Sequence, residues 1–147
     1  MKLVPLAAAL VAAATLATGC SSPAASSVSV TAGPTAASAP AAGSSLAPAE
    51  FAAAAKLANT VLLDVRTPTE FAGGHLPGAV NLDVESADFA TKAATLDPAK
   101  SYAVYCRSGN RSKVAMTALQ QLGIGSLYDL SGGIGAWQSA GGEIVTN

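Results

Sequence analysis

Positive charge is scarce in this sequence. Lys and Arg number 8 against 9 Asp and Glu, so the formal net charge is −1, and charged residues make up only 12% of the chain. Proteins that bind nucleic acid concentrate Lys and Arg on one face or along one helix. Because no such excess is present, the sequence argues against a nucleic acid partner.

Aromatic residues are also few, and they are unevenly distributed. The one Trp, three Tyr and three Phe all lie between Phe51 and Trp137. Large buried side chains supply much of a hydrophobic core, and a chain of 147 residues has room for one ordinary domain. We therefore predict a single domain that covers residues 46–147.

Near the N-terminus, the apolar run is too short for a transmembrane helix, which needs about 20 residues. This run, Leu3 to Ala17, is mainly apolar, follows Lys2 and is interrupted by Pro5. A short apolar segment behind a positive start is typical of a secretory signal. We therefore predict residues 1–19 as a signal peptide outside the folded domain.

Only two cysteines are present, Cys20 and Cys106. The residues Ala17-Thr18-Gly19-Cys20 resemble the end of a bacterial lipoprotein signal, although Ala17 stands where such signals more often have Leu. The resemblance implies cleavage before Cys20, acylation of its thiol, and a lipid-anchored protein on the extracytoplasmic side of the cell membrane. An ordinary secretory signal that contains a cysteine is the alternative. With Cys20 acylated, Cys106 would be a lone thiol.

The stretch from Ser21 to Ser45 contains no charged and no aromatic residue. Apart from two Val, its Ser, Ala, Thr, Pro and Gly residues cannot bury enough apolar surface to offset the entropy lost on ordering. We therefore predict residues 20–45 as a lipidated N-terminus followed by a disordered linker.

Strand and helix patterns alternate through the predicted domain. Short apolar runs predict strands at 61–65, 79–82, 102–105 and 126–130, and helical patterns fall at 48–58, 67–72, 86–96, 112–122 and from 132 onward. The residues of the 112–122 helix with core spacing are Val114, Ala115, Ala118, Leu119 and Leu122. The alternation favours an α/β fold whose parallel sheet has helices on both faces, with chemistry at the carboxyl ends of the strands.

One loop joins the 102–105 strand to the 112–122 helix, and it reads Cys106-Arg107-Ser108-Gly109-Asn110-Arg111-Ser112. Backbone N–H groups and the positive end of the helix dipole favour an anion at such a position. Together with two arginines, they would lower the pKa of Cys106 from about 8.5 and favour the thiolate. Cys106 is therefore the candidate nucleophile. A buried structural cysteine is the alternative.

The rest of this loop offers candidate substrate contacts. We expect Arg107 and Arg111 to contact a bound anion, Arg111 from the helix side; a solvated loop charge is the alternative for both. Ser108 and Asn110 would contribute backbone N–H groups. Gly109 would allow a conformation or a close approach that a Cβ blocks. The predicted substrate-binding set is Arg107, Ser108, Gly109, Asn110, Arg111 and Ser112.

A series of short motifs follows a fixed order along the predicted domain. The motifs are Asp64-Val65-Arg66, Glu70-Phe71, Gly74 to Ala79, Asn81-Leu82, the Cys106 to Ser112 loop, Leu130 to Ile134, and Trp137. In this order and spacing, they resemble a rhodanese-like sulfurtransferase domain. The resemblance implies that Cys106 takes sulfane sulfur from a small anionic donor such as thiosulfate, forms a persulfide, and passes the sulfur to a thiol or cyanide. It implies no metal and no organic cofactor.

Loop length separates the members of this superfamily. Four residues lie between Cys106 and Arg111, as in sulfurtransferases of this fold, whereas related phosphatases and arsenate reductases have a loop one residue longer. Ser112 stands where those enzymes need Arg, which disfavours phosphatase or arsenate reductase activity. A further alternative is a non-catalytic sulfur carrier or redox-sensing module that holds a persulfide or sulfenic acid.

Outside the loop, the polar and aromatic residues of these motifs have expected structural roles. His75, the only histidine, is expected to make a hydrogen bond that fixes its loop rather than to act as a base. Asp64, Arg66 and Glu70 are expected to form a polar set near the sheet edge. Trp137 is expected to pack the last helix.

Overall fold

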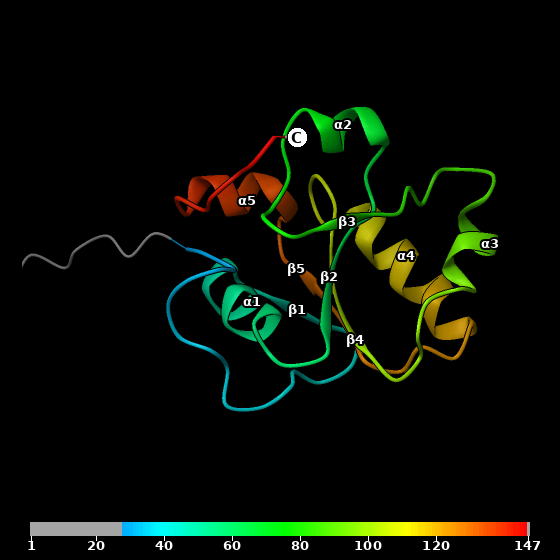
Figure 1. Cartoon of the computed structure of the whole chain (residues 1–147), viewed down its shortest axis with the longest axis horizontal. Coiled ribbons are helices and arrows are strands. Elements are labelled where there is room, and N and C mark those ends of the chain that lie inside the picture. Colours follow the sequence, from blue (N-terminus) through cyan, green and yellow to red (C-terminus); the bar gives the residue numbers. More distant parts are fainter. Residues whose placement is uncertain (1–27, 147) are drawn as a thin grey trace, which may run out of the picture.

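A central parallel sheet organises the computed structural model, which describes residues 28–146 (Figure 1). Its five strands have the order β1-β5-β4-β2-β3, and each pairing is parallel. The strands are β1 (Ser44–Leu46), β2 (Thr60–Asp64), β3 (Val80–Asn81), β4 (Ser101–Tyr105) and β5 (Leu127–Leu130). The helices are α1 (Pro48–Ala55), α2 (Pro68–Ala72), α3 (Phe89–Ala93), α4 (Asn110–Gln121) and α5 (Gly133–Ser139). The predicted α/β fold is confirmed.

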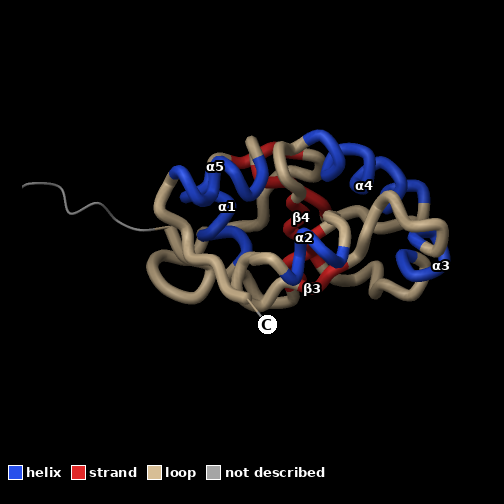
Figure 2. Tube along the Cα trace, turned by 90° about the horizontal axis from the view of Figure 1, so that it is seen from above, coloured by secondary structure: helices blue, strands red, loops and turns tan. Residues whose placement is uncertain are grey.

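Helices cover both faces of the sheet, as the view from above shows (Figure 2). On one face, α3 and α4 contribute Phe89 and Leu119 to a buried apolar cluster. On the other face, α1 and α5 contribute Phe51 and Trp137 to a second cluster. The sheet is therefore shielded from water on both sides, which is typical of parallel sheets.

The central strand β4 supplies side chains to both clusters in alternation. Tyr102 and Val104 belong to the cluster under α3 and α4, whereas Ala103 and Tyr105 belong to the cluster under α1 and α5. This alternation follows from the two-residue period of a strand. Cys106 continues the series, so its side chain lies on the α4 face.

The short helix α2, within the predicted helical segment 67–72, begins with a capping box. Thr67 Oγ1 accepts a hydrogen bond from Glu70 N at 3.3 Å, and Glu70 Oε2 accepts one from Thr67 N at 3.2 Å. Pro68 occupies the first helical position, where a missing N–H is harmless. These contacts fix the place of Glu70, which matters for the site described below.

The predicted boundary between linker and domain at residue 46 is wrong. Ser44–Leu46 forms β1, which adds an edge strand to the sheet by pairing with β5. A three-residue strand without charged or aromatic residues gives no recognisable pattern in the sequence. Its stability comes from the ladder offered by β5, which lies more than 80 positions further along the chain.

The prediction of a disordered linker is also wrong for the rest of residues 28–45. Val28 and Val30 pack against the cluster that contains Phe51. Lys56 of the segment after α1 donates from Nζ to Ser29 O at 2.8 Å. These contacts need a partner surface that composition alone does not reveal.

The core-facing stripe of α4 differs in part from the predicted one. Val114 is 63% exposed and Leu122 is 44% exposed. The buried residues of this helix are Ser112, Ala115, Met116 and Leu119. Both stripes satisfy helical periodicity and share Ala115 and Leu119, so only the packing against the sheet distinguishes them.

Within residues 28–146, no helix combines the length and the apolar character needed to cross a membrane. The predicted signal peptide, residues 1–19, and the predicted lipidation site, Cys20, lie outside the described residues.

Candidate active site

The candidate nucleophile lies where the central strand of the sheet ends. Cys106 directly follows β4, and its side chain is fully buried. Helix α4 begins at Asn110, so only residues 107–109 separate Cys106 from the helix. Asn110 itself is exposed. The thiol therefore lies near the positive end of a 12-residue helix, where negative charge is stabilised.

Backbone N–H groups surround the sulfur of Cys106. Gly109 N donates a hydrogen bond to Sγ at 3.0 Å. Burial alone would raise the pKa of the thiol, but hydrogen bonds from the backbone N–H groups of Ser112, Ser108 and Gly109, with a smaller contribution from the Ser112 side chain, outweigh this effect and lower the pKa. The thiolate is therefore favoured relative to that of a free cysteine, as expected for a nucleophile.

Two glycines give the loop its backbone geometry. Gly109 has φ of 95°, a conformation that a residue with a Cβ rarely adopts. Gly133, at the start of α5, approaches so closely that a Cβ on it would lie 2.4 Å from Cys106 O. This approach allows Ile134 N to donate to Cys106 O at 2.9 Å. The first turn of α5 therefore supports the backbone of the cysteine loop.

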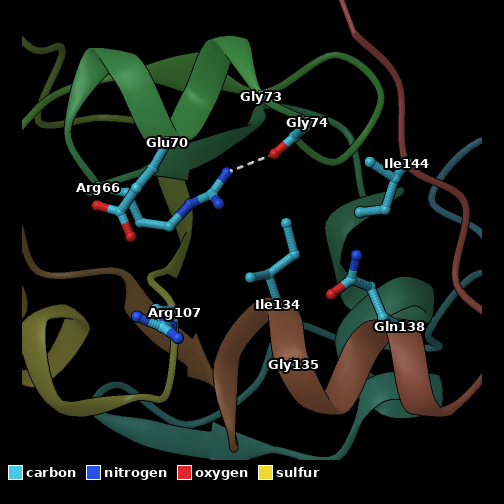
Figure 3. A pocket seen from close by; sticks show the side chains of 9 residues that line it. All are labelled: Arg66, Glu70, Gly73, Gly74, Arg107, Ile134, Gly135, Gln138 and Ile144. Carbon is cyan, nitrogen blue, oxygen red and sulfur yellow. Dashed lines mark hydrogen bonds between the residues drawn. The ribbon is translucent and has the colours of Figure 1, made fainter.

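A cavity of about 490 Å³ lies beside this loop (Figure 3). Its lining residues are Arg66, Glu70, Gly73, Gly74, Arg107, Ile134, Gly135, Gln138 and Ile144. Cys106 does not line the cavity, but the next residue, Arg107, does. Among the described residues, Arg107 forms no ion pair. The cavity therefore carries an uncompensated positive charge next to the candidate nucleophile.

The second arginine of the cavity is held by a buried carboxylate. Arg66 Nη2 contacts Asp64 Oδ2 at 2.5 Å and donates to Gly74 O at 2.8 Å. Asp64 is fully buried and Arg66 is only 5% exposed. The expected polar set is thus present for these two residues, and the ion pair helps to fix the guanidinium. Figure 3 shows this guanidinium at the cavity, with its hydrogen bond to Gly74 O.

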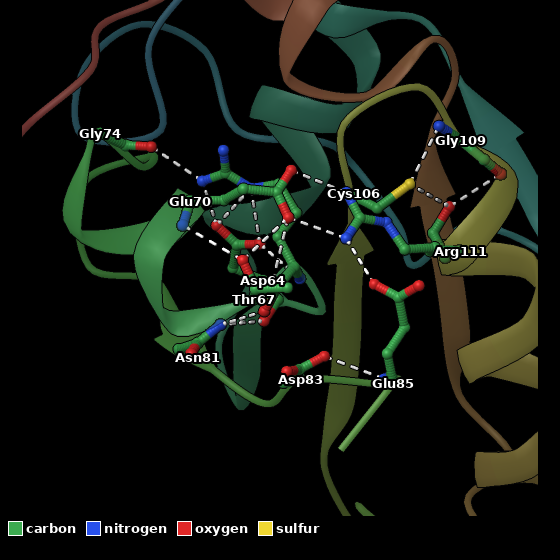
Figure 4. A network of polar contacts seen from close by, with 12 residues as sticks. Asp64, Thr67, Glu70, Gly74, Asn81, Asp83, Glu85, Cys106, Gly109 and Arg111 are labelled. Carbon is green, nitrogen blue, oxygen red and sulfur yellow. Dashed lines mark hydrogen bonds and ion pairs between the residues drawn. The ribbon is translucent and has the colours of Figure 1, made fainter.

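Arg111 does not line the cavity, because two carboxylates bind it (Figure 4). Its Nη1 contacts Glu70 Oε2 at 2.8 Å and Glu85 Oε2 at 2.9 Å, and its Nη2 contacts Glu70 Oε1 at 2.8 Å. The hydrogen bonds that Arg111 donates lower the pKa of Glu70 to about 2, and the same bonds to Glu70 raise the pKa of Arg111. Arg111 thereby links α4 to α2.

The expectation that Arg111 faces a bound anion therefore differs from the structure. Both terminal nitrogens of the guanidinium are occupied by carboxylates, which neutralise its charge. The main partner, Glu70, lies 41 positions earlier in the chain. Spacing within the loop could not reveal this contact.

The C-terminal segment after α5 completes the cavity wall. Val145 and His75 exchange two backbone hydrogen bonds of 2.9 Å, and Trp137 Nε1 donates to Glu143 O at 2.9 Å. Held at these two points, the segment places Ile144 in the cavity lining. Sequence analysis missed this residue because nothing in the local pattern connects it to the loop.

Two residues with expected structural roles have those roles. The ring Nδ1 of His75 is 3.0 Å from Phe71 O, so the single histidine fixes its own loop. Trp137 is fully buried and packs α5 against the sheet. Within residues 28–146, no cluster of three or more His, Cys, Asp or Glu side chains is arranged to hold a metal ion.

Known proteins similar to this chain share one family description. A family model described as Rhodanese-like domain matches residues 47–140. A sulfurtransferase of Allochromatium vinosum is 39% identical over 93 residues, covering 61% of this chain and 85% of the relative. The thiosulfate sulfurtransferase GlpE of Pseudomonas syringae is also 39% identical over 93 residues, covering 63% of this chain and 85% of that protein. The crystal structure of a rhodanese-related protein from Thermoplasma volcanium superposes with a TM-score of 0.63 at 33% identity, covering 71% of this chain and 99% of that chain.

Proposed function

This chain belongs to the rhodanese-like domain family and is a thiosulfate sulfurtransferase-like enzyme, and from that premise we propose that it moves sulfane sulfur through a persulfide on Cys106. The donor is a small anion such as thiosulfate, and the acceptor is a thiol or cyanide. The observation that carries the proposal is the Cys106 thiol, which has a lowered pKa and lies next to a cavity with an unpaired arginine.

In the first half-reaction, the Cys106 thiolate attacks the outer sulfur of thiosulfate. A bond forms between the two sulfurs as the sulfur–sulfur bond of the donor breaks, and sulfite leaves with the electron pair. Arg107 would attract the donor's oxygens into the cavity by a charge-assisted hydrogen bond. The N–H groups that stabilise the thiolate would also stabilise the negative charge of the persulfide.

In the second half-reaction, the acceptor attacks the outer sulfur of the persulfide. Cyanide leaves as thiocyanate, and the electron pair of the broken bond returns to Cys106 as a thiolate. The proposed mechanism uses no general base, because the lowered pKa of Cys106 favours the thiolate. The single histidine, His75, is accordingly not needed as a base, and its Nδ1 is hydrogen-bonded with Phe71 O.

Steady-state assays test this function directly. With thiosulfate and cyanide, the full-length chain should release sulfite and form thiocyanate in equal amounts. Absence of both products from folded protein would contradict the proposal. Formation of a stable persulfide without turnover would instead favour a sulfur carrier.

We also propose that the chain is lipid-anchored through Cys20 on the extracytoplasmic side of the cell membrane. Support comes from the resemblance of residues 1–20 to a lipoprotein signal. Cys20→Ala should move the protein to the soluble fraction, because one thiol carries the lipid. Cys106→Ser is the matched control and should remain membrane-bound. Retention of Cys20→Ala on membranes after high-salt and carbonate washing would contradict the anchor.

A further inference from the structure

A buried carboxylate lies beneath the cysteine loop without a positive partner. Asp129 of β5 is fully buried, and no Lys, Arg or His in the described part of the chain forms an ion pair with it. Its two oxygens are bound by hydroxyl groups instead: Ser45 Oγ of β1 donates to Oδ1, and Ser112 Oγ of α4 donates to Oδ2 at 2.7 Å. Burying a carboxylate costs free energy unless it is paired or hydrogen-bonded, and here the two hydroxyl groups provide the hydrogen bonds.

Three potential hydrogen-bond partners lie near the hydroxyl of Ser112, which has only one proton to donate. Its Oγ is 2.7 Å from Asp129 Oδ2, 3.0 Å from Gly109 O and 3.8 Å from Cys106 Sγ. A hydroxyl has one proton to donate. The carboxylate is the nearest acceptor and makes a charge-assisted hydrogen bond, so the Ser112 hydroxyl donates its proton to Asp129 Oδ2. Ser112 then presents mainly a lone pair to the sulfur at 3.8 Å, which suits a neutral thiol as donor and leaves the hydroxyl a weak donor to a thiolate.

We propose that Asp129 is a positioning residue that holds the Ser112 hydroxyl proton away from the Cys106 sulfur, and that Ser45 supports the carboxylate from the other side. The proposal rests on the proposed function only in taking Cys106 as the nucleophile. Backbone N–H groups then provide most of the hydrogen bonding to the thiolate. Because the nucleophilicity of a thiolate falls as its pKa falls, Asp129 prevents the loop from stabilising the thiolate so strongly that it becomes a poor nucleophile.

The other charged groups around the loop are arranged differently. Arg66 is paired with Asp64, and Arg111 is paired with Glu70 and Glu85. The remaining charged neighbour in the loop is Arg107, which lines the cavity. Among the described residues, Asp129 is thus the carboxylate connected to the sulfur through a single hydroxyl.

The contact from Ser45 gives the N-terminal edge strand a role at the site. Ser45 lies outside residues 47–140, the part of the chain that matches the family model. It pairs with Asp129 across the β1–β5 ladder, so the two side chains lie on the same face of the sheet. Displacement of β1 would remove one of the two hydrogen bonds to the buried carboxylate.

The pH titration of Cys106 in Asp129→Asn tests the proposal. Thiolate ultraviolet absorbance of the full chain is measured as a difference from the matching Cys106→Ser protein, so that Cys106 alone contributes. We expect the midpoint to fall by about one pH unit, because a negative charge is lost and an amide can donate to Ser112 Oγ, which frees the hydroxyl proton for the sulfur. The exposed Asp88→Asn, an equal charge change directly before α3, should leave the midpoint unchanged. A higher midpoint in Asp129→Asn would overturn the proposal, because Asp129 would then be a proton acceptor for the thiol.

Two further variants separate positioning from simple charge repulsion. In a Ser112→Ala background, Asp129→Asn should shift the midpoint by less than half as much, since the residue through which Asp129 acts is absent; a shift of full size would contradict the proposal. Ser45→Ala should raise the midpoint, because Asp129 then draws the Ser112 proton more strongly, and an unchanged midpoint would remove Ser45 from the account. The titration needs no sulfur donor, so a failure of sulfur transfer alongside the expected shifts would count against the proposed function alone.

Discussion

The two arginines of the cysteine loop are close in sequence but lie in opposite electrostatic environments. Arg107 is exposed, lines the cavity and has no ion-pair partner among residues 28–146. Arg111 is partly buried and binds the carboxylates of Glu70 and Glu85. A bound anion would therefore find free positive charge on the Arg107 side and a neutralised group on the Arg111 side. The same residue type thus lines the cavity without an ion-pair partner at one position and joins α4 to α2 at the other.

The largest effect on activity is expected from substitution of Cys106, the residue that directly follows β4. Cys106→Ser should abolish thiocyanate formation, because a hydroxyl of similar size cannot form a persulfide. Circular dichroism and thermal unfolding should show that the fold is retained. Substantial turnover by the folded variant would show that another group carries the sulfur.

Removal of the free arginine should have the next largest effect. Arg107→Ala should lower kcat/KM for thiosulfate by roughly 10- to 150-fold, since a charge-assisted hydrogen bond contributes about 1.5 to 3 kcal/mol. Arg107→Lys should restore part of the loss because the charge is kept, although the planar fork is not. Stability should be unchanged in both variants. If the kinetics of Arg107→Ala match the wild type, the donor does not bind in this cavity.

Removal of the neutralised arginine should mainly affect stability. Arg111→Ala should lower the free energy of unfolding by about 1 kcal/mol, because a partly buried, bidentate ion pair is lost. Its kcat/KM for thiosulfate should fall less than that of Arg107→Ala. A double-mutant cycle with Glu70→Gln should show that the two effects are not additive. The control is Lys113→Ala, which removes an exposed positive charge from the same helix.

An Arg111→Ala defect in thiosulfate kinetics as large as that of Arg107→Ala would contradict the comparison. It would indicate that the carboxylates release Arg111 when the donor binds.

The smallest effect concerns the pH dependence of stability. The pKa of Glu70 is about 2 in the folded chain, below its ordinary value of 4.5, mainly because Arg111 donates to it. Between these values the unfolded chain binds more protons, so stability rises with pH. The contribution of this group is present above about pH 4.5 and is lost as the pH falls through 2. Glu70→Gln should therefore show a shallower loss of stability in acid, measured by urea unfolding, and an unchanged slope would indicate that the pair does not persist in solution.

Local chemistry in the sequence was enough to predict most of the elements and the position of Cys106 between a strand and a helix. Cys106 follows an apolar strand and precedes a helix, and Gly109 was assigned a special conformation, which its φ of 95° confirms. The capping box of Thr67 and Glu70 needs only four neighbouring residues. Such features depend on contacts within a few positions, which the order of residues records directly.

Features that depend on distant partners could not be predicted in the same way. Strand β1 forms because its backbone pairs with that of β5. Ile144 lines the cavity because hydrogen bonds with His75 and Trp137 hold the C-terminal segment in place. The role of Arg111 is set by Glu70, a residue of another helix. In each case the sequence shows the residue but not the surface it meets.

The mass of the protein after brief exposure to thiosulfate tests the central claim most directly. If Cys106 is the sulfur carrier, the chain should gain one sulfur atom, proteolysis should locate it on the peptide containing Cys106, and cyanide should remove it with formation of thiocyanate. Cys106→Ser should show no gain. An unchanged mass, or a sulfur atom on a peptide without Cys106, would contradict the account.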